Sequence, residues 1–216
     1  MDERRRTWLR IVALGGAAAV IARTLAKGDM PPGVNQLRGT ATVNGAAARV
    51  GTPVGLGDRI STGGDSQAVV VVGADAFLMR SNTSIEVKGR EGLLTDMIVA
   101  TGQVLSVFSK KPVAIKAASA SIGIRGTGAY IEVDPASVYF CLCYGDALLE
   151  GPGMSAKEVQ TTHHESPLLI TQAGGVMRAD PGPFRNHSDA ELIMLEALVG
   201  REPPFLKSGV YPSGKY

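Results

Sequence analysis

The chain has few cysteines, histidines and aromatic residues, and it has no long apolar segment. Its 216 residues include two cysteines and three histidines, and aromatic residues make up 5%. No apolar run approaches the roughly 18 residues of a membrane-spanning helix, which excludes a polytopic membrane protein. Since 44% of the residues are hydrophobic, the chain can still bury one sizeable core, and this excludes a disordered or collagen-like protein.

Common catalytic motifs and a strong excess of one charge are also missing. The sequence contains no Gly-x-Ser-x-Gly, phosphate-binding loop or His-Glu-x-x-His. The formal charge is +2, but residues 1–26 hold five basic and two acidic residues, which leaves 17 basic and 18 acidic residues in the remainder. A basicity confined to the N-terminus gives no support for a nucleic-acid partner. We expect a protein that is not an enzyme.

Residues 1–26 have the layout of an export signal. A basic start is followed by a 12-residue apolar run at 11–22 and then by small residues, and this run is too short for a comfortable transmembrane helix. Arg5 and Arg6, followed by Thr-Trp-Leu-Arg, resemble a twin-arginine signal, which exports folded proteins. An ordinary secretory signal and a retained anchor are the alternatives. We therefore expect a periplasmic protein, which would contact the inner membrane only if its N-terminus is retained uncleaved as an anchor.

The body of the chain predicts short β-strands. Turn sequences such as Asn44-Gly45 separate segments of β-forming residues at intervals of about 8–12 residues, without helical periodicity between them. This spacing predicts an all-β fold, and the four valines at 69–72 predict a strand buried on both faces. The expected strands are 38–43, 67–72, 76–80, 84–87, 97–100, 103–108, 113–116, 128–133, 138–144, 147–150, 158–162 and 168–171.

One helix is expected near the C-terminus, at residues 188–200. Ser188 and Glu191 form the sequence pattern of a capping box, and Gly200 is typical of a helix end. Leu192, Leu195 and the apolar residues at 198–199 then form one stripe. We interpret the helix as a lid on the β body, or alternatively as a partner-binding helix, and residues 201–216 as a flexible tail.

Residues 37–151 resemble the FecR domain family of bacterial envelope proteins. The resemblance rests on segments 38–45 and 54–63, on Thr101-Gly-Gln-Val, on Ile-Arg-Gly-Thr at 124–127 with its following strand, and on Tyr144-Gly-Asp-Ala. It implies a FecR-like β-sandwich or short β-solenoid that senses or binds in the envelope. Signalling members carry a cytoplasmic sigma-factor regulator before a membrane helix. Only about ten residues precede the apolar run here, so we expect no direct control of a sigma factor.

The signature Arg125-Gly126-Thr127 has a structural interpretation of its own. A glycine inside a strand permits a bulge or a close backbone approach, and an arginine beside it can hold carbonyl groups or a carboxylate. A direct contact with a ligand is the alternative.

Both cysteines and two of the three histidines fall in two short segments. Cys141 and Cys143 share one face of an extended strand, because alternate side chains point the same way. His163 and His164 follow about twenty residues later, in the extension 152–180, and a turn at 151–153 can return them to the cysteines. Two cysteines and two histidines can hold zinc, and mixed sets hold iron–sulfur clusters. Adjacent histidines reach one metal only if the backbone bends between them.

Other interpretations of these residues remain open. Cys141 and Cys143 are alternatively a redox-active or disulfide pair, although a bridge within a regular strand is strained, or they are merely buried small residues. We interpret His187 as a solvated turn residue, or alternatively as a further ligand or outer partner.

We expect an exported FecR-like binding or sensor protein with a zinc or iron–sulfur centre at Cys141, Cys143, His163 and His164, and an unknown envelope protein as partner. The alternative is a metal-free scaffold that binds an envelope protein or a glycan. A thiol–disulfide enzyme is the least favoured function.

Overall fold

The computed structural model describes residues 30–207, which form one large sheet with one α-helix and a short 3₁₀ helix. The predicted signal, with Arg5 and Arg6, and residues 208–216 of the predicted tail lie outside the described residues. Within residues 30–207, no helix has the length and apolar character to cross a membrane. The strands are β1 (Gly33–Arg38), β2 (Ala41–Val43), β3 (Ala46–Ala47), β4 (Arg59–Thr62), β5 (Gln67–Val72), β6 (Asp75–Met79), β7 (Ser84–Arg90), β8 (Leu93–Val107), β9 (Pro112–Ala117), β10 (Ala120–Val133), β11 (Ser137–Gly151), β12 (Met154–Thr161), β13 (Leu168–Ala173) and β14 (Val176–Pro181).

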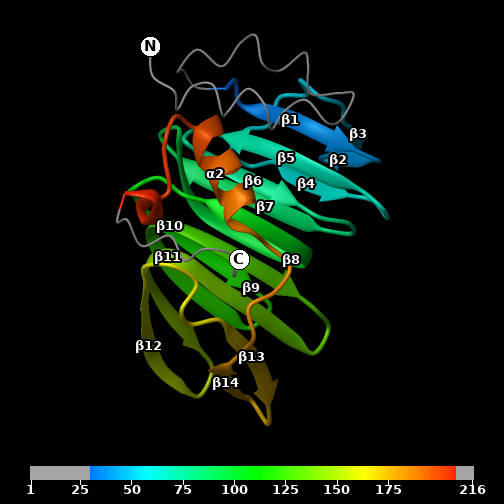
Figure 1. Ribbon diagram of the computed structural model, residues 1–216. Coiled ribbons are helices and arrows are strands. Elements are labelled where there is room, and N and C mark those ends of the chain that lie inside the picture. Colours follow the sequence, from blue (N-terminus) through cyan, green and yellow to red (C-terminus); the bar gives the residue numbers. More distant parts are fainter. Residues whose placement is uncertain (1–29, 208–216) are drawn as a thin grey trace.

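The sheet is open and largely antiparallel, and three long strands connect its parts. Its main path runs β14-β13-β11-β10-β9-β8-β7-β4-β2-β3, with β1, β5 and β6 joined to β8 and with β12 joined to β11. Among the described strands, β8 and β9 form the one parallel pair. β10 pairs with β9 through its first half and with β8 through its second half. The expected all-β fold with one helix near the C-terminus is confirmed (Figure 1).

The central strands are buried on both faces. In β5, Val70 and Val72 belong to the larger hydrophobic core, whereas Val69 and Val71 face the smaller core on the opposite side. The predicted strand with two buried faces is thereby confirmed. β11 alternates in the same way between the two cores, and this alternation decides which of its side chains reach the candidate site.

Several predicted strands are parts of longer ones. The segments 97–100 and 103–108 fall mainly within β8, and the segments 138–144 and 147–150 both lie in β11. Glycine suggested an interruption in each case, but Gly102 at φ 82° and Gly145 at φ 99° kink the chain without ending the ladder. The expected list also lacks β3, β4 and β14, and it includes only Arg38 of β1.

Helix α2 (Asp189–Leu198) covers the smaller core. Ser188 is its N-cap and forms the predicted capping box with Glu191, and Gly200 follows its end with φ 71°. Leu192 and Leu195 are fully buried against that core, and the helix lies across β6 and β8 as the expected lid (Figure 1). Residues 204–206, in the segment expected to be flexible, form the 3₁₀ helix η2 (Pro204–Leu206). Phe205 of this helix is buried in the same smaller core.

Candidate metal centre

Two cysteines of β11 lie on the helix-covered face of the sheet. Cys141 and Cys143 point to this face together, while Leu142 between them enters the larger core on the other side. Both side chains are fully buried, and no disulfide joins them. The period of the strand therefore places two thiols next to each other in an interior with no solvent.

His164 reaches these thiols because β12 returns the chain to β11. After β12 the backbone turns sharply: the Glu165 carboxylate accepts the Thr162 N–H at 2.7 Å, and His164 adopts φ 56°. The His164 N–H donates to the Cys143 carbonyl oxygen at 3.0 Å. This backbone bond anchors the His164 side chain, which is 2% exposed, beside the cysteines.

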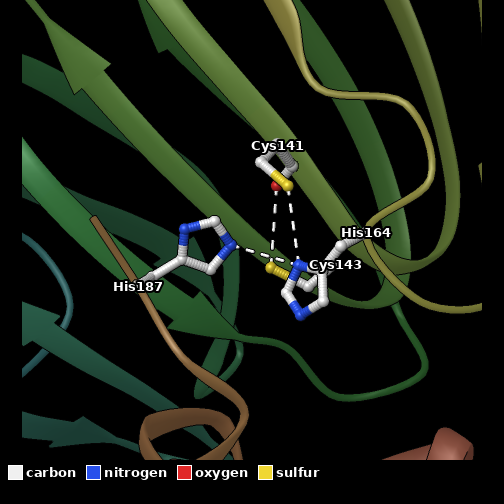
Figure 2. Close-up of side chains that lie close together, drawn as sticks. All are labelled: Cys141, Cys143, His164 and His187. Carbon is white, nitrogen blue, oxygen red and sulfur yellow. Dashed lines mark hydrogen bonds between the residues drawn. The ribbon is translucent and has the colours of Figure 1, made fainter. Parts of the chain in front are cut away.

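His187 belongs to the segment that precedes α2, and the buried carboxylate of Glu132 holds that segment. Glu132 accepts a hydrogen bond from Asn186 and pairs with Arg185, both at 2.6 Å. The His187 ring stacks on Tyr130 with 4.5 Å between centroids, and its Nδ1 donates to the Arg185 carbonyl oxygen at 2.7 Å. The ring is 6% exposed, and its Nε2 points towards His164 (Figure 2).

Cys141, Cys143, His164 and His187 bring four donor atoms together, all within 4.8 Å of one another (Figure 2). His164 Nδ1 lies 3.2 Å from His187 Nε2 and 3.6 Å from Cys141 Sγ. A tetrahedral zinc ion with its usual bond lengths separates two nitrogens by about 3.3 Å and a nitrogen from a sulfur by about 3.6 Å. Both observed distances therefore match the edges of a zinc tetrahedron.

The hydrogen-bond partners of the two imidazoles indicate which nitrogen of each ring faces the other ring. His187 Nδ1 faces a carbonyl oxygen, and His164 Nε2 lies 3.1 Å from Asp189 Oδ1, so both of these nitrogens carry the hydrogen. The remaining nitrogens, His164 Nδ1 and His187 Nε2, then direct lone pairs at each other across 3.2 Å. Two facing lone pairs repel unless a proton or a metal ion lies between them.

The two thiols have opposite acidities. The hydrogen bond from Cys143, supported by His164 and His187, lowers the pKa of the Cys141 thiol far below its usual value despite burial. Burial, together with the neighbouring Cys141, raises the pKa of Cys143. Cys141 is therefore the more acidic of the two thiols.

The structure does not bring His163 into this group, and here it differs from the expected ligand set. His163 Nε2 lies 2.8 Å from Asp189 Oδ1. The bend does let both adjacent histidines point inward, but only His164 reaches the sulfurs, because neighbouring side chains diverge from one backbone. The interpretation of His187 as a solvated turn residue is wrong, since it is buried in the position expected for His163.

Sequence reasoning missed Asp189 altogether and gave His187 a minor role. Both flank Ser188, the N-cap of α2. Since the apolar stripe of the helix predicted docking on the β body, the same docking carries the residues at its N-terminus to the sheet. The signal was therefore present in the position of His187 directly before the capping box.

The signature Arg125-Gly126-Thr127 lies in β10, apart from the four donor atoms. Gly126 has φ 64° within a bulge opposite β11, and a side-chain carbon there would meet Lys110 at 3.0 Å. Thr127 is buried, and Arg125 is exposed opposite Asp146. The positive φ and the close approach of Lys110 therefore explain why a glycine is needed at position 126.

No protein-family model and no curated protein matches this chain. Two solved structures, each described as a "putative anti-sigma factor" from Parabacteroides distasonis, are similar to it with a TM-score of 0.47 and sequence identities of 11% and 10%. Each similarity covers 57% of this chain and 59% of the solved one, so the match spans about three fifths of the length of these structures.

Proposed function

We propose that the chain is an exported, FecR-like binding protein that holds one zinc ion through Cys141, Cys143, His164 and His187. The observation that carries this proposal is the pair of imidazole nitrogens 3.2 Å apart, whose other nitrogens both donate hydrogen bonds, with a sulfur 3.6 Å away. All four side chains are at least nine-tenths buried. Two thiolates and two neutral imidazoles are a preferred ligand set for zinc.

A single ion suits the geometry better than an iron–sulfur cluster. In a two-iron cluster with this ligand set, the cysteines bind one iron and the histidines the other, so the cluster separates the two pairs. Here Cys141 Sγ and His164 Nδ1 are in direct contact at 3.6 Å. All four donor atoms also lie within 4.8 Å of one another, which suits a single ion.

The ion would join three separate segments of the chain. Cys141 and Cys143 belong to β11, His164 follows β12, and His187 precedes α2. Four protein ligands leave no open coordination position, which is typical of a structural rather than a catalytic site. We therefore propose a binding or sensor domain that is stabilised by metal and is not an enzyme.

The resemblance to the FecR family supports a place in the bacterial envelope and an envelope protein as partner. Residues 1–26 support export by the twin-arginine route. Replacing Arg5 and Arg6 with lysine should retain the full chain in the cytosol, as measured by fractionation and immunoblotting. Export of this variant at the wild-type level would contradict the twin-arginine route.

The metal itself is tested on the full chain, purified from cytosol without oxygen. Elemental analysis should find one zinc per chain and the spectrum should show no visible band. His187→Ala should lose most of this zinc, while Arg125→Ala, which changes an exposed residue of β10, should keep it. If the sample instead contains iron and sulfide and absorbs visible light, the site holds an iron–sulfur cluster and the zinc proposal is wrong. An absence of stoichiometric metal would leave the metal-free scaffold as the function.

A further inference from the structure

Asp189 connects the two histidines that follow β12. It is the first residue of α2 and is 3% exposed. One oxygen, Oδ1, lies 2.8 Å from His163 Nε2 and 3.1 Å from His164 Nε2. A carboxylate at the first turn of a helix is also stabilised by the positive end of the helix dipole. The fold therefore supplies a buried carboxyl group directly behind one of the four candidate ligands.

His163, His164 and Asp189 could themselves form a second metal site, since their donor atoms lie within 4.8 Å of one another. The distances decide against it. Separations of 2.8 and 3.1 Å are those of N–H···O hydrogen bonds. The distance at His163, 2.8 Å, is well below the roughly 3.3 Å edge between two nitrogen or oxygen ligands of a tetrahedral ion, so it argues against a common ion for His163 and Asp189. Two donated hydrogen bonds to one carboxylate oxygen explain the geometry without a second ion.

We infer that Asp189 is a positioning residue of the metal centre, and that His163 acts through Asp189 and does not bind the ion. This inference rests on the proposed zinc site. Asp189 accepts the Nε2–H of His164, which fixes the tautomer and turns the Nδ1 lone pair towards the sulfurs. Outer carboxylates orient metal-bound histidines in this way. His163 donates to the same oxygen and holds the carboxylate in place.

The N-terminal end of α2 thereby positions both a proposed ligand and the carboxylate behind another ligand. His187, a ligand, and Asp189, the outer carboxylate, stand on either side of the N-cap Ser188. Glu191 closes the capping box and pairs with Arg80 at 2.9 Å. The helix cap therefore determines the distance between His187 and Asp189, the carboxylate that orients His164.

The test compares Asp189→Asn, Asp189→Glu and His163→Gln in the full chain, with Asp146→Asn, an exposed carboxylate of β11, as the control. Zinc affinity is measured by competition with a chromophoric chelator, and Co²⁺ is used as a spectroscopic probe. Asp189→Asn should weaken zinc binding about 10–100-fold, and His163→Gln should weaken it less. The thiolate–Co²⁺ charge-transfer intensity and the band positions should stay the same. Asp189→Glu should recover part of the affinity, and Asp146→Asn should match the wild type.

Three results would overturn the inference. If Asp189 only stabilises the fold, Asp189→Asn lowers the unfolding midpoint of metal-free and zinc-bound protein equally and leaves affinity unchanged. If His163 is a ligand, His163→Gln changes the Co²⁺ bands. Two ions per wild-type chain would make Asp189 a ligand. If the wild-type chain binds no metal, the proposed function itself is refuted. This outcome is distinct from the three results above, in which the wild-type chain does bind metal.

Discussion

A single methyl group added at Gly128 should test how tightly α2 is packed over the metal centre. Gly128 lies in β10 beneath the helix, and its φ is not positive, so the backbone accepts alanine. The new carbon would lie 2.5 Å from Tyr144 Cε1, 2.8 Å from Cζ and 3.1 Å from Leu192 Cδ2. An ordinary carbon–carbon contact is about 3.5 Å, so the Tyr144 ring must move by roughly 1 Å.

Tyr144 has little room for this movement. Its ring is 2% exposed and packs against Phe205 with 6.0 Å between centroids, and its hydroxyl donates to the buried carboxylate of Glu196 in α2. Displacing the ring therefore displaces the helix. We expect Gly128→Ala to reduce the free energy of unfolding by about 1–3 kcal/mol, the usual effect of overpacking. It should also weaken zinc binding, since α2 carries Asp189 and follows His187.

Gly123 in the same strand provides a matched control. A carbon added there would meet no atom closer than 3.9 Å, and this glycine also lacks a positive φ. Gly123→Ala should therefore be neutral or stabilise the protein by about 0.4–1 kcal/mol, because it restricts the unfolded chain. Urea denaturation of the zinc-loaded full chain measures both variants. Equal stability of the two variants would refute the argument from packing.

Three further predictions concern the ion, the helix and the buried tyrosines. Chelation should lower the free energy of unfolding by about 4 kcal/mol relative to a sample with free zinc at 1,000 times its Kd, and added zinc should restore it; unchanged urea midpoints would contradict the site. Leu192→Ala should destabilise the fold by about 2–5 kcal/mol because this side chain is fully buried, and a thermal melt that matches the wild type would refute the docked lid. Burial, followed by the carboxylates Glu132 and Glu196 respectively, raises the pKa of Tyr130 and Tyr144 far above the usual value. The unfolded chain therefore loses these protons first, and stability should fall as pH rises above about 10; tyrosinate absorbance from these residues in the still-folded protein would contradict this.

Local sequence patterns determined the character of the fold. The turn residues and β-forming segments predicted an all-β chain, the valines at 69–72 predicted a strand with two buried faces, and Ser188 with Glu191 predicted where the helix begins. Each of these features depends on neighbours within a few residues. For the same reason, Cys141 and Cys143 were predictable as side chains on one face of a strand.

The boundaries of the strands depended on partners distant in the sequence. Gly102 and Gly145 look like strand ends in isolation, because glycine weakens a strand. Both lie inside long ladders, since the neighbouring strands supply hydrogen bonds on either side of each kink. β14 was missed because its pairing with β13 determines it more than its own composition does.

The membership of the candidate metal centre was decided mainly by tertiary structure. The sequence determined that two thiols share a face and that histidines return to them after a hairpin. It could not determine which histidine meets the sulfurs, because that choice depends on the φ of His164 and on where α2 docks. Docking of the helix brings His187 to the sulfurs and places Asp189 between His163 and His164. A ligand set assembled from β11, the turn after β12 and the residue before the N-cap of α2 depends on packing between elements that are distant in the sequence.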